Sequence, residues 1–234
     1  MFFTFLLSSM LHAEESCTLD SVTFPSLNTE QSTVLKNYGA SCVDTVNNEK
    51  AAAELFRAAQ NALKIDDIAT AKEQINTLMK RYPDTRIARR AQRTQKELNI
   101  IGTTVSQDLD TVAWLQGKAS FSDAKLSLVV FWELWCPHCK REIPNLQKMY
   151  DEFQGRDFNI IGLTKLSRNK STEEVMNFLQ TNSVAYPIGK EDGSLSTLFA
   201  VSGIPAGALV KDGKVVWRGH PAQLSTAMIE KHLK

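Results

Sequence analysis

The segment FWELWCPHCKREIP at residues 131–144 constrains the fold of this 234-residue chain more than any other part of it. Residues 128–132 (LVVFW) are apolar, β-branched and aromatic, which is typical of a buried strand. A helix is expected to begin at about Pro137, because proline is tolerated in the first helical turn, where its missing N–H has no partner to lose. Cys136 then lies at the amino end of this helix, and Cys139 follows on the same face.

This placement gives the two cysteines different chemistry. Unpaired N–H groups and the dipole at the amino end of a helix stabilise an anion, so the thiolate of Cys136 is favoured, and a protonated His138 adds to this effect. Cys139 is close enough to close a disulfide with Cys136. We therefore expect Cys136 to be the exposed attacking thiol and Cys139 the buried resolving thiol. A structural zinc site would need two more ligands nearby, so neither a metal nor an organic cofactor is expected.

Strand and helix patterns alternate from about residue 103 to the carboxyl terminus. Residues 206–210 and 215–217 form a hairpin through Asp212-Gly213, a pair that favours tight turns. The order β-α-β followed by β-β-α predicts an α/β sandwich with strands of mixed direction. The other elements expected here are a buried strand at 159–163 and helices at 142–153, 172–180 and 224–233.

Several separated motifs of this region agree in order with one known fold. Gly203-Ile204-Pro205 stands just before the final hairpin, Pro144 interrupts the helix that follows the cysteines, and residues 209–221 supply a closing hairpin followed by a glycine. Together with the strand-Trp-Cys-x-x-Cys-helix arrangement, they resemble the thioredoxin superfamily over residues 103–234. The resemblance implies that the Ile204–Pro205 bond is cis. It also implies that these two residues shape a groove that holds an extended client chain beside the thiols.

Within that superfamily, the spacing Trp132-x-x-Trp135-Cys136-x-x-Cys139-x-x-Glu142-x-Pro144 is similar to the TlpA/ResA group of thiol reductases. The resemblance implies that Glu142 lies near the thiols, as a proton acceptor for Cys139; a surface helix charge is the alternative. Trp135 is expected at the rim of the active site. Glu133 is expected to be a charge that faces solvent, and a role in tuning Cys136 is the alternative. Thioredoxin itself has a buried aspartate where this chain has Val130, so that proton relay is absent.

The residues before this domain predict an all-α region at 49–102. Apolar side chains recur at helical spacing over 52–63 and again over 68–79. Tyr82-Pro83 ends the second helix, because the residue before a proline leaves the helical region. Asp84 is then expected to cap a third, basic helix.

This all-α region resembles a tetratricopeptide-type hairpin through Ala59, Ala71 and Tyr82-Pro83-Asp84. The likeness covers little more than one repeat, and repeat proteins need several to bury their faces. A plain helical hairpin that packs on the next domain or on a second subunit is the alternative. Formation of a homo-oligomer through these helices is therefore one expectation.

The first 48 residues predict export. Residues 1–13 (MFFTFLLSSMLHA) hold an apolar run too short to span a bilayer, and they fit a secretory signal that lacks the usual positive charge at its start. Residues 14–48 are polar and predict an irregular segment with a short helix near 29–38. Export leads to an oxidising compartment such as the periplasm, where Cys17 and Cys42 would form a structural disulfide. Two unrelated free thiols are the alternative.

The sequence as a whole predicts an extracytoplasmic thiol-disulfide oxidoreductase, with the fold of a thioredoxin-like mixed-sheet α/β sandwich. Its expected partners are protein clients with disulfides or thiols and a membrane redox partner that recycles the pair. A formal net charge of +1 gives no reason to expect nucleic acid. The direction of exchange stays open, since the TlpA/ResA resemblance implies a reductase while Pro137-His138, the dipeptide of the oxidase DsbA, implies an oxidant.

Two other functions compete with this interpretation. A non-enzymatic binding or assembly protein would use the N-terminal helices and keep the thioredoxin-like domain as a platform, but such a domain has no chemical need for both thiols. A peroxiredoxin-like peroxidase would need threonine and arginine near its cysteine, and this pattern is not visible.

Overall fold

The computed structural model describes residues 29–109 and 112–234. The chain divides into two compact units, one formed by residues 1–59 and 73–91 and the other by residues 60–72 and 92–234. Among the described residues, three helices precede the sheet: α2 (Thr29–Lys64), α3 (Ile68–Arg81) and α4 (Arg86–Asn99). Within the described residues, no helix combines the length and the apolar composition that crossing a membrane requires.

Helix α2 corrects the sequence prediction of an irregular segment over residues 14–48 for its described part, residues 29–48. One continuous helix of 36 residues begins at Thr29, where only a short helix was expected. No proline interrupts residues 29–64, and Gly39 is the single glycine among them. The turns of α2 that pack against α3 fix one end of the helix. The helix then extends through the preceding polar residues at little cost, because adding a turn to an existing helix is far easier than nucleating a new one.

The amino end of α4 is capped by a different residue from the one that the sequence indicated. The hydroxyl oxygen of Thr85 accepts a hydrogen bond from the Ala88 N–H at 3.1 Å. The carboxylate of Glu49, from α2, accepts the next free donors, the N–H groups of Arg86 and Ile87. Asp84, the expected cap, stays exposed. Thr85 and Glu49 together satisfy orphan donors of the first turn.

The second unit holds a six-stranded mixed sheet in the order β1-β4-β3-β2-β5-β6. Strands β2, β3 and β4 are parallel to one another, while β5 is antiparallel to β2, β6 to β5, and β1 to β4. The strands are β1 (Ala113–Gln116), β2 (Leu126–Phe131), β3 (Phe158–Thr164), β4 (Ile188–Lys190), β5 (Ala206–Lys211) and β6 (Lys214–Gly219). The predicted fold class, an α/β mixed-sheet sandwich, is confirmed.

The central strand β2 is buried along its whole length, and its side chains alternate between two apolar layers. Leu128, Val130 and Trp132 enter one layer, with residues of α5 (Pro137–Glu152), α6 (Thr172–Thr181) and α8 (Thr226–Leu233). Val129 and Phe131 enter the other, beside Phe121 and Phe199. Burial on both faces explains the continuous apolar run in the sequence.

The predicted hairpin is present between β5 and β6. Asp212 and Gly213 both adopt positive φ, 49° and 71°, which a two-residue turn between strands of right-handed twist needs. Ser171 caps α6 in a capping box with Glu174, and Ser225 caps α8. Short elements were not predicted from the sequence: β1, β4, helix α7 (Ser194–Leu198) and a 3-10 turn at Pro221–Gln223.

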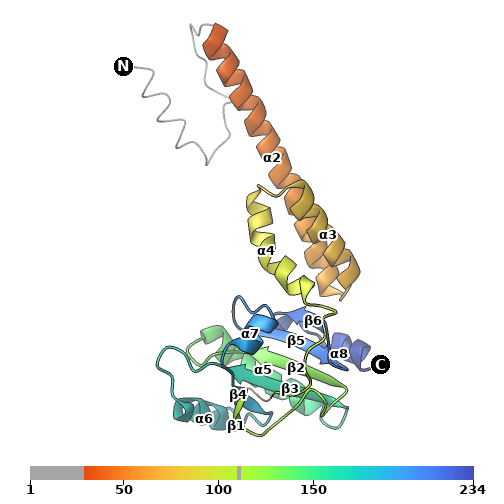
Figure 1. The fold of residues 1–234 in the computed structure, drawn as a ribbon, viewed down its shortest axis with the longest axis vertical. Coiled ribbons are helices and arrows are strands. Elements are labelled where there is room, and N and C mark those ends of the chain that lie inside the picture. The colour runs from red at the N-terminus through yellow and green to blue at the C-terminus, as the bar shows by residue number, and fades with distance from the viewer. Residues whose placement is uncertain (1–28, 110–111) are drawn as a thin grey trace. The chain divides into compact units, whose positions relative to one another are not determined.

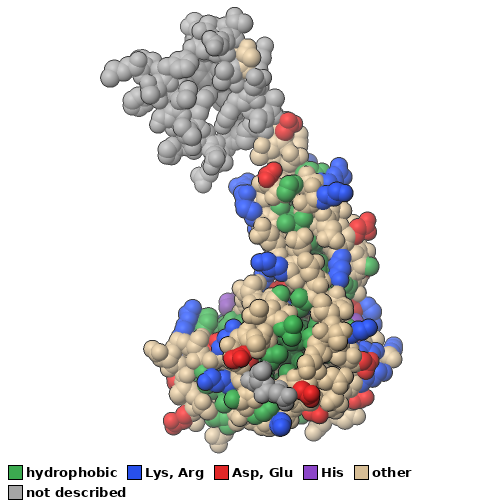
Figure 2. Space-filling model, viewed as in Figure 1, with side chains coloured by type: hydrophobic (Ala, Val, Ile, Leu, Met, Phe, Trp, Pro, Cys, Tyr) green, Lys and Arg blue, Asp and Glu red, His purple; other side chains and the backbone are tan. Residues whose placement is uncertain are grey.

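Charged side chains of both signs intersperse on the face drawn in Figure 2, as expected for a chain with a formal net charge of +1.

Candidate active site

Helix α5 begins as the sequence predicted, with Cys136 at its amino end. Cys136 is the N-cap residue, with extended backbone angles, and Pro137 occupies the first turn. The sulfur of Cys136 accepts a hydrogen bond from the Cys139 N–H at 3.3 Å. A cysteine sulfur thus takes the place that a serine or aspartate oxygen takes in an ordinary N-cap. Both cysteines are free thiols in this structure.

The burial of Cys136 differs from the sequence prediction. Cys139 is fully buried, as expected, but Cys136 is also covered, with 4% of its surface exposed. Its thiol points to the Ile204 carbonyl oxygen, at a sulfur-to-oxygen distance of 3.8 Å. The loop before β5 therefore covers the sulfur, a contact between residues far apart in the sequence that no local pattern indicates.

The pKa of Cys139 is raised above the ordinary value of a thiol. Burial is the largest cause, and the neighbouring Cys136 and the negative charge of Glu133 raise it further, while the Glu133 backbone lowers it. Cys139 therefore keeps its proton at neutral pH. The proton must leave before this thiol can act as a nucleophile.

The loop that covers Cys136 contains the predicted proline. The Ile204–Pro205 peptide bond is cis, as the resemblance implies. Pro205 is buried, and Ile204 is half-buried and packs against both apolar layers. Pairing of Ala206 with Phe131 holds the start of β5 beside the end of β2, from which the chain continues to the cysteines. The sheet thus brings together two motifs separated by more than sixty residues.

Trp135 and His138 border the cysteines in different ways. The indole N–H of Trp135 donates to the Ser167 hydroxyl at 2.8 Å, and the guanidinium of Arg168 stacks 3.5 Å from the ring centroid. His138 is exposed, and its Nδ1 lies 2.7 Å from a guanidinium nitrogen of Arg141. The loop between β3 and α6 is therefore attached to the rim of the site through Trp135.

The structure places Glu142 on α5 as a half-buried residue, and no hydrogen bond or ion pair of its carboxylate occurs among the described residues. Its charge acts on Tyr186, whose pKa is raised first by burial and then by Glu142. The role of Glu142 as a proton acceptor for Cys139 stays a prediction.

The burial of Glu133 contradicts the favoured expectation from the sequence, which kept a role beside Cys136 only as the alternative. This residue was expected to face solvent, but it is buried, with 6% of its surface exposed. Its carboxylate accepts the Ser167 N–H at 3.0 Å, and its carbonyl oxygen accepts the Cys136 N–H at 3.1 Å. One signal in the sequence could have found it: a single carboxylate stands between Trp132 and Leu134, in a run that is otherwise apolar.

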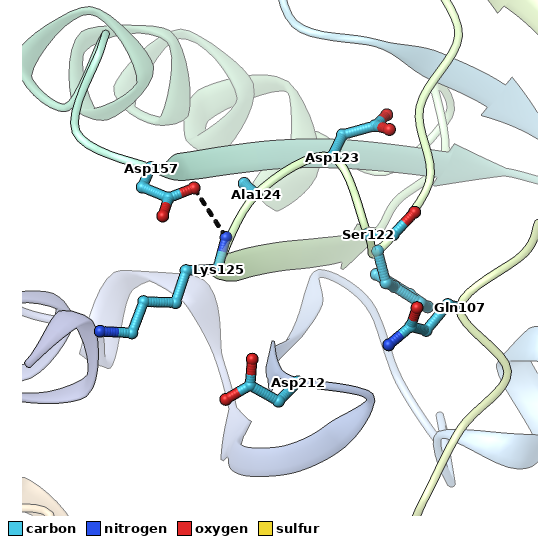
Figure 3. A pocket seen from close by; sticks show the side chains of 8 residues that line it. Gln107, Ser122, Asp123, Ala124, Lys125, Asp157 and Asp212 are labelled. Carbon is cyan, nitrogen blue, oxygen red and sulfur yellow. Dashed lines mark hydrogen bonds between the residues drawn. The ribbon is translucent and has the colours of Figure 1, made fainter.

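Figure 3 shows a polar pocket of about 360 Å³ whose lining does not include the thiols. Lys125 and Asp157 precede β2 and β3, whereas Cys136 follows the carboxyl end of β2. The Lys125 backbone N–H donates to the Asp157 carboxylate at 2.9 Å. The other residues that Figure 3 labels are Gln107, Ser122, Asp123, Ala124 and Asp212. Among the described residues, no group of three His, Cys, Asp or Glu side chains is arranged to hold a metal ion.

The structure combines a mixed sheet, a Cys-x-x-Cys pair at the start of the helix after the central strand, and a cis-proline loop that faces this pair. These features define the class of thioredoxin-like proteins. A family model described as the AhpC/TSA family matches residues 101–218, and the chain belongs to this family.

Individual relatives agree with this class. The chain is 25% identical to the sporulation thiol-disulfide oxidoreductase A of Bacillus subtilis over 87 residues, which cover 37% of this chain and 53% of that protein. It is 23% identical to the thiol-disulfide oxidoreductase ResA of Halalkalibacterium halodurans over 121 residues, 51% of this chain and 63% of that one. The matched region therefore spans less than two thirds of either relative. The predicted resemblance to the ResA group is confirmed.

A crystal structure of the thioredoxin domain of a thiol-disulfide oxidoreductase from Bacteroides vulgatus is also similar. It has a TM-score of 0.48 and 23% sequence identity, and the match covers 57% of this chain and 98% of that one.

Other predictions fall outside the part of the chain that the structure describes. Residues 1–13 and Cys17 lie there, as does the side chain of Cys42, whose position is within α2. The signal peptide and the Cys17–Cys42 disulfide stay predictions. The helices predicted over 49–99 are present, while their likeness to a tetratricopeptide repeat also stays a prediction.

Proposed function

We propose that the protein is an extracytoplasmic thiol-disulfide oxidoreductase, which exchanges disulfides with protein clients through Cys136 and Cys139. The observation that carries the proposal is the unequal environment of the two thiols at one helix start. The Cys136 sulfur accepts the Cys139 N–H at 3.3 Å, and Cys139 lies fully buried behind it. An accepting position of this kind suits a thiolate better than a neutral thiol.

Exchange in the reducing direction takes two steps. The Cys136 thiolate attacks one sulfur of a client disulfide, so a mixed disulfide forms and the other client sulfur leaves as a thiolate. Cys139 loses its proton and attacks the Cys136 sulfur. The mixed disulfide breaks, the second client thiolate leaves, and the Cys136–Cys139 disulfide remains. Oxidation of a client dithiol follows the same steps in reverse.

The cis-proline loop supports a protein client. The Ile204 carbonyl oxygen lies 3.8 Å from the attacking sulfur, and its backbone precedes strand β5. An extended client segment that hydrogen-bonds to this backbone would place its own cysteine at Cys136. Residues 1–13 support export, and an exported dithiol needs a membrane redox partner for recycling. The half-buried apolar residues of α2, Leu55, Phe56 and Leu63, support a homo-oligomer or a bound partner.

Insulin reduction by dithiothreitol tests the activity. The wild-type protein should accelerate the turbidity that reduced insulin produces, and Cys136→Ser should abolish the acceleration. If the wild type is no faster than dithiothreitol alone, although it is folded and binds a partner, the binding or assembly protein becomes the better account. The direction follows from the redox potential of the pair, about −270 mV for a thioredoxin-like reductase and about −120 mV for a DsbA-like oxidant.

A further inference from the structure

Glu133 differs from the other buried carboxylates of the described residues. Asp66 pairs with the Lys231 ammonium at 2.6 Å and with His232 at 3.0 Å. Glu191 pairs with Lys165 at 3.6 Å, and it also accepts the Ser196 hydroxyl and the Gly193 N–H. Glu133 has no ion pair, and the Ser167 N–H is its one hydrogen-bond donor among the described residues.

A buried carboxylate without a cation lowers the stability of a fold, because its desolvation is not offset by an ion pair. Glu133 has 6% of its surface exposed, so solvent does little to offset that cost. Groups of this kind concentrate at functional sites, where an unpaired carboxylate can exchange a proton. Stability gives no reason for Glu133 to stand at this position, whereas the chemistry of the adjacent thiols does.

The backbone and the loop hold Glu133 against the active site. Its carbonyl oxygen accepts the Cys136 N–H at 3.1 Å, and its carboxylate is fixed by the Ser167 N–H. Ser167 in turn accepts the indole N–H of Trp135 through its hydroxyl. The negative charge of Glu133 raises the pKa of Cys139, the thiol that has to lose a proton in the second step of exchange.

We propose that Glu133 accepts the proton of Cys139 when this thiol attacks the mixed disulfide. The proposal deepens the proposed function and rests on it. The Cys139 proton moves to the carboxylate, the new sulfur–sulfur bond forms to Cys136, and the bond from Cys136 to the client breaks with the electron pair on the client sulfur. The proton on Glu133 then passes to the leaving client thiolate or to solvent. In the reverse direction Glu133 returns the proton to Cys139.

Other groups near the thiols are less suited to this task. Val130 has no ionisable group. The charge of Glu142 raises the pKa of Tyr186, and it is not among the charges that raise the pKa of Cys139. On the loop that packs against Glu133, Lys165 pairs with Glu191 and Lys170 pairs with Glu174, while Arg168 stacks on Trp135. On α5, the titratable neighbours are the exposed His138, Lys140 and Arg141 together with the half-buried Glu142.

The variant Glu133→Gln keeps the shape of the side chain and an oxygen that accepts the Ser167 N–H, but it cannot take a proton. Reduced protein is mixed with a disulfide-bonded peptide and quenched with acid at set times. Mass spectrometry then separates the mixed disulfide from the final disulfide. We expect the variant to resolve the mixed disulfide about 10²-fold more slowly near neutral pH, as for loss of a general base, with its formation unchanged. The deficit should shrink as the pH rises and hydroxide replaces the carboxylate.

A purely electrostatic role makes the opposite prediction. Removing the negative charge would lower the pKa of Cys139, so resolution in Glu133→Gln would be as fast as in the wild type or faster, and this result would overturn the proposal. Glu133→Asp, which keeps a base, should recover part of the rate. The matched control is Glu152→Gln, which removes an exposed carboxylate from the end of α5 that lies far from the cysteines and should leave the rate unchanged. Slow resolution in Glu142→Gln with normal resolution in Glu133→Gln would assign the role to Glu142.

Two further measurements keep the test decisive. If Glu133→Gln does not fold, infrared difference spectra of the wild type should show a transient protonated carboxyl band that rises as the mixed disulfide is resolved, and its absence would contradict the proposal. If the wild-type protein forms no mixed disulfide at all, the proposed function fails. If it forms and resolves one with a pH profile that Glu133→Gln shares, only the role of Glu133 fails.

Discussion

At the scale of single residues, the two thiols are distinguished by what surrounds each sulfur. Cys136 has 4% of its surface exposed and contacts the cis-proline loop, whereas Cys139 has no exposed surface. In the proposed exchange, Cys136 is therefore the sulfur that a client would reach by displacing that loop contact, and Cys139 would meet only Cys136.

The first prediction follows from this difference. Cys139→Ala removes the resolving thiol, so mixed disulfides between Cys136 and clients should accumulate. Cys136→Ala leaves a thiol that clients do not reach, so it should accumulate none. Cells that express either variant are treated with acid and an alkylating agent, and adducts are counted on non-reducing gels. Equal amounts of adduct in the two variants would contradict the assignment of roles, and more adduct from Cys136→Ala would reverse it.

The second prediction concerns pH and the raised pKa of Cys139. Below about pH 8.5, the ordinary value for a thiol, Cys139 is protonated in the folded and the unfolded chain. Above it, the unfolded chain loses the proton while the folded chain keeps it, because burial raises the pKa in the fold. The unfolded state then binds fewer protons, so the free energy of unfolding falls as the pH rises, by up to about 1.4 kcal/mol per pH unit.

Urea unfolding of the reduced protein between pH 7 and 10 measures this fall. Cys139→Ala is the control, since it lacks the thiol and keeps Tyr186, whose pKa is also raised by burial. The wild type should lose stability more steeply than the variant above pH 8.5. If the free energies of unfolding of the two proteins fall in parallel as the pH rises, the raised pKa of Cys139 is contradicted.

The sequence predicts the position of the thiols better than their surroundings. A strand, two cysteines and a proline lie within one segment, so their order alone indicates a helix that starts at Cys136. The cover over Cys136 comes from Ile204, and the burial of Glu133 comes from the loop around Ser167. Both depend on sheet pairing between distant parts of the chain, which no local pattern records.

At the scale of elements, success followed length and periodicity. Strands β2 and β3 and helices α5 and α6 lie within a few residues of their predicted bounds, because each is a long apolar or amphipathic run. β1, β4 and α7 have three to five residues each, too few to show a period. β4 forms because Gly162 to Thr164 of β3 offers it a paired edge.

The third prediction tests the corrected cap of α4. Thr85→Ala removes the hydroxyl that accepts the Ala88 N–H, and should lower the free energy of unfolding by about 1 kcal/mol. Asp84→Ala, at the neighbouring position that the sequence indicated, is the matched control and should have almost no effect. Urea unfolding followed by circular dichroism compares the two variants with the wild type. A larger loss from Asp84→Ala would restore the original assignment.

At the scale of the whole molecule, the sheet does not form a unit by itself. Residues 60–72 and 92–102 group with it, although the sequence placed the domain boundary between residues 102 and 103. Two contacts explain the grouping. Asp66 pairs with Lys231 of α8, and the Arg218 guanidinium of β6 lies 3.8 Å from the Glu97 carboxylate of α4. The Gly102 N–H also donates to the Val215 carbonyl at 2.7 Å.

The Glu97 contact matters because the Arg218 side chain is fully buried. The backbone carbonyls of Phe199, Gly207 and Gly219 accept its N–H groups, but they carry no formal charge. Glu97 is thus the carboxylate that offsets the charge of a buried cation. Removing one partner of a buried ion pair costs about 3 kcal/mol or more, because the other charge stays buried without compensation.

The last prediction compares the full chain with Thr103–Lys234 expressed alone. The shorter chain lacks Glu97 and Asp66, so we expect it to unfold at a lower urea concentration than the full protein. It should still exchange with small disulfides, because Cys136, Cys139 and the cis-proline loop all lie within Thr103–Lys234. Glu97→Gln in the full chain should reproduce part of the loss. Glu230→Gln, which breaks the exposed pair with Arg156, is the matched control and should cost little. Equal stability of both chains would make residue 103 a true domain edge, and a folded but inactive short chain would assign the helices a part in the active site.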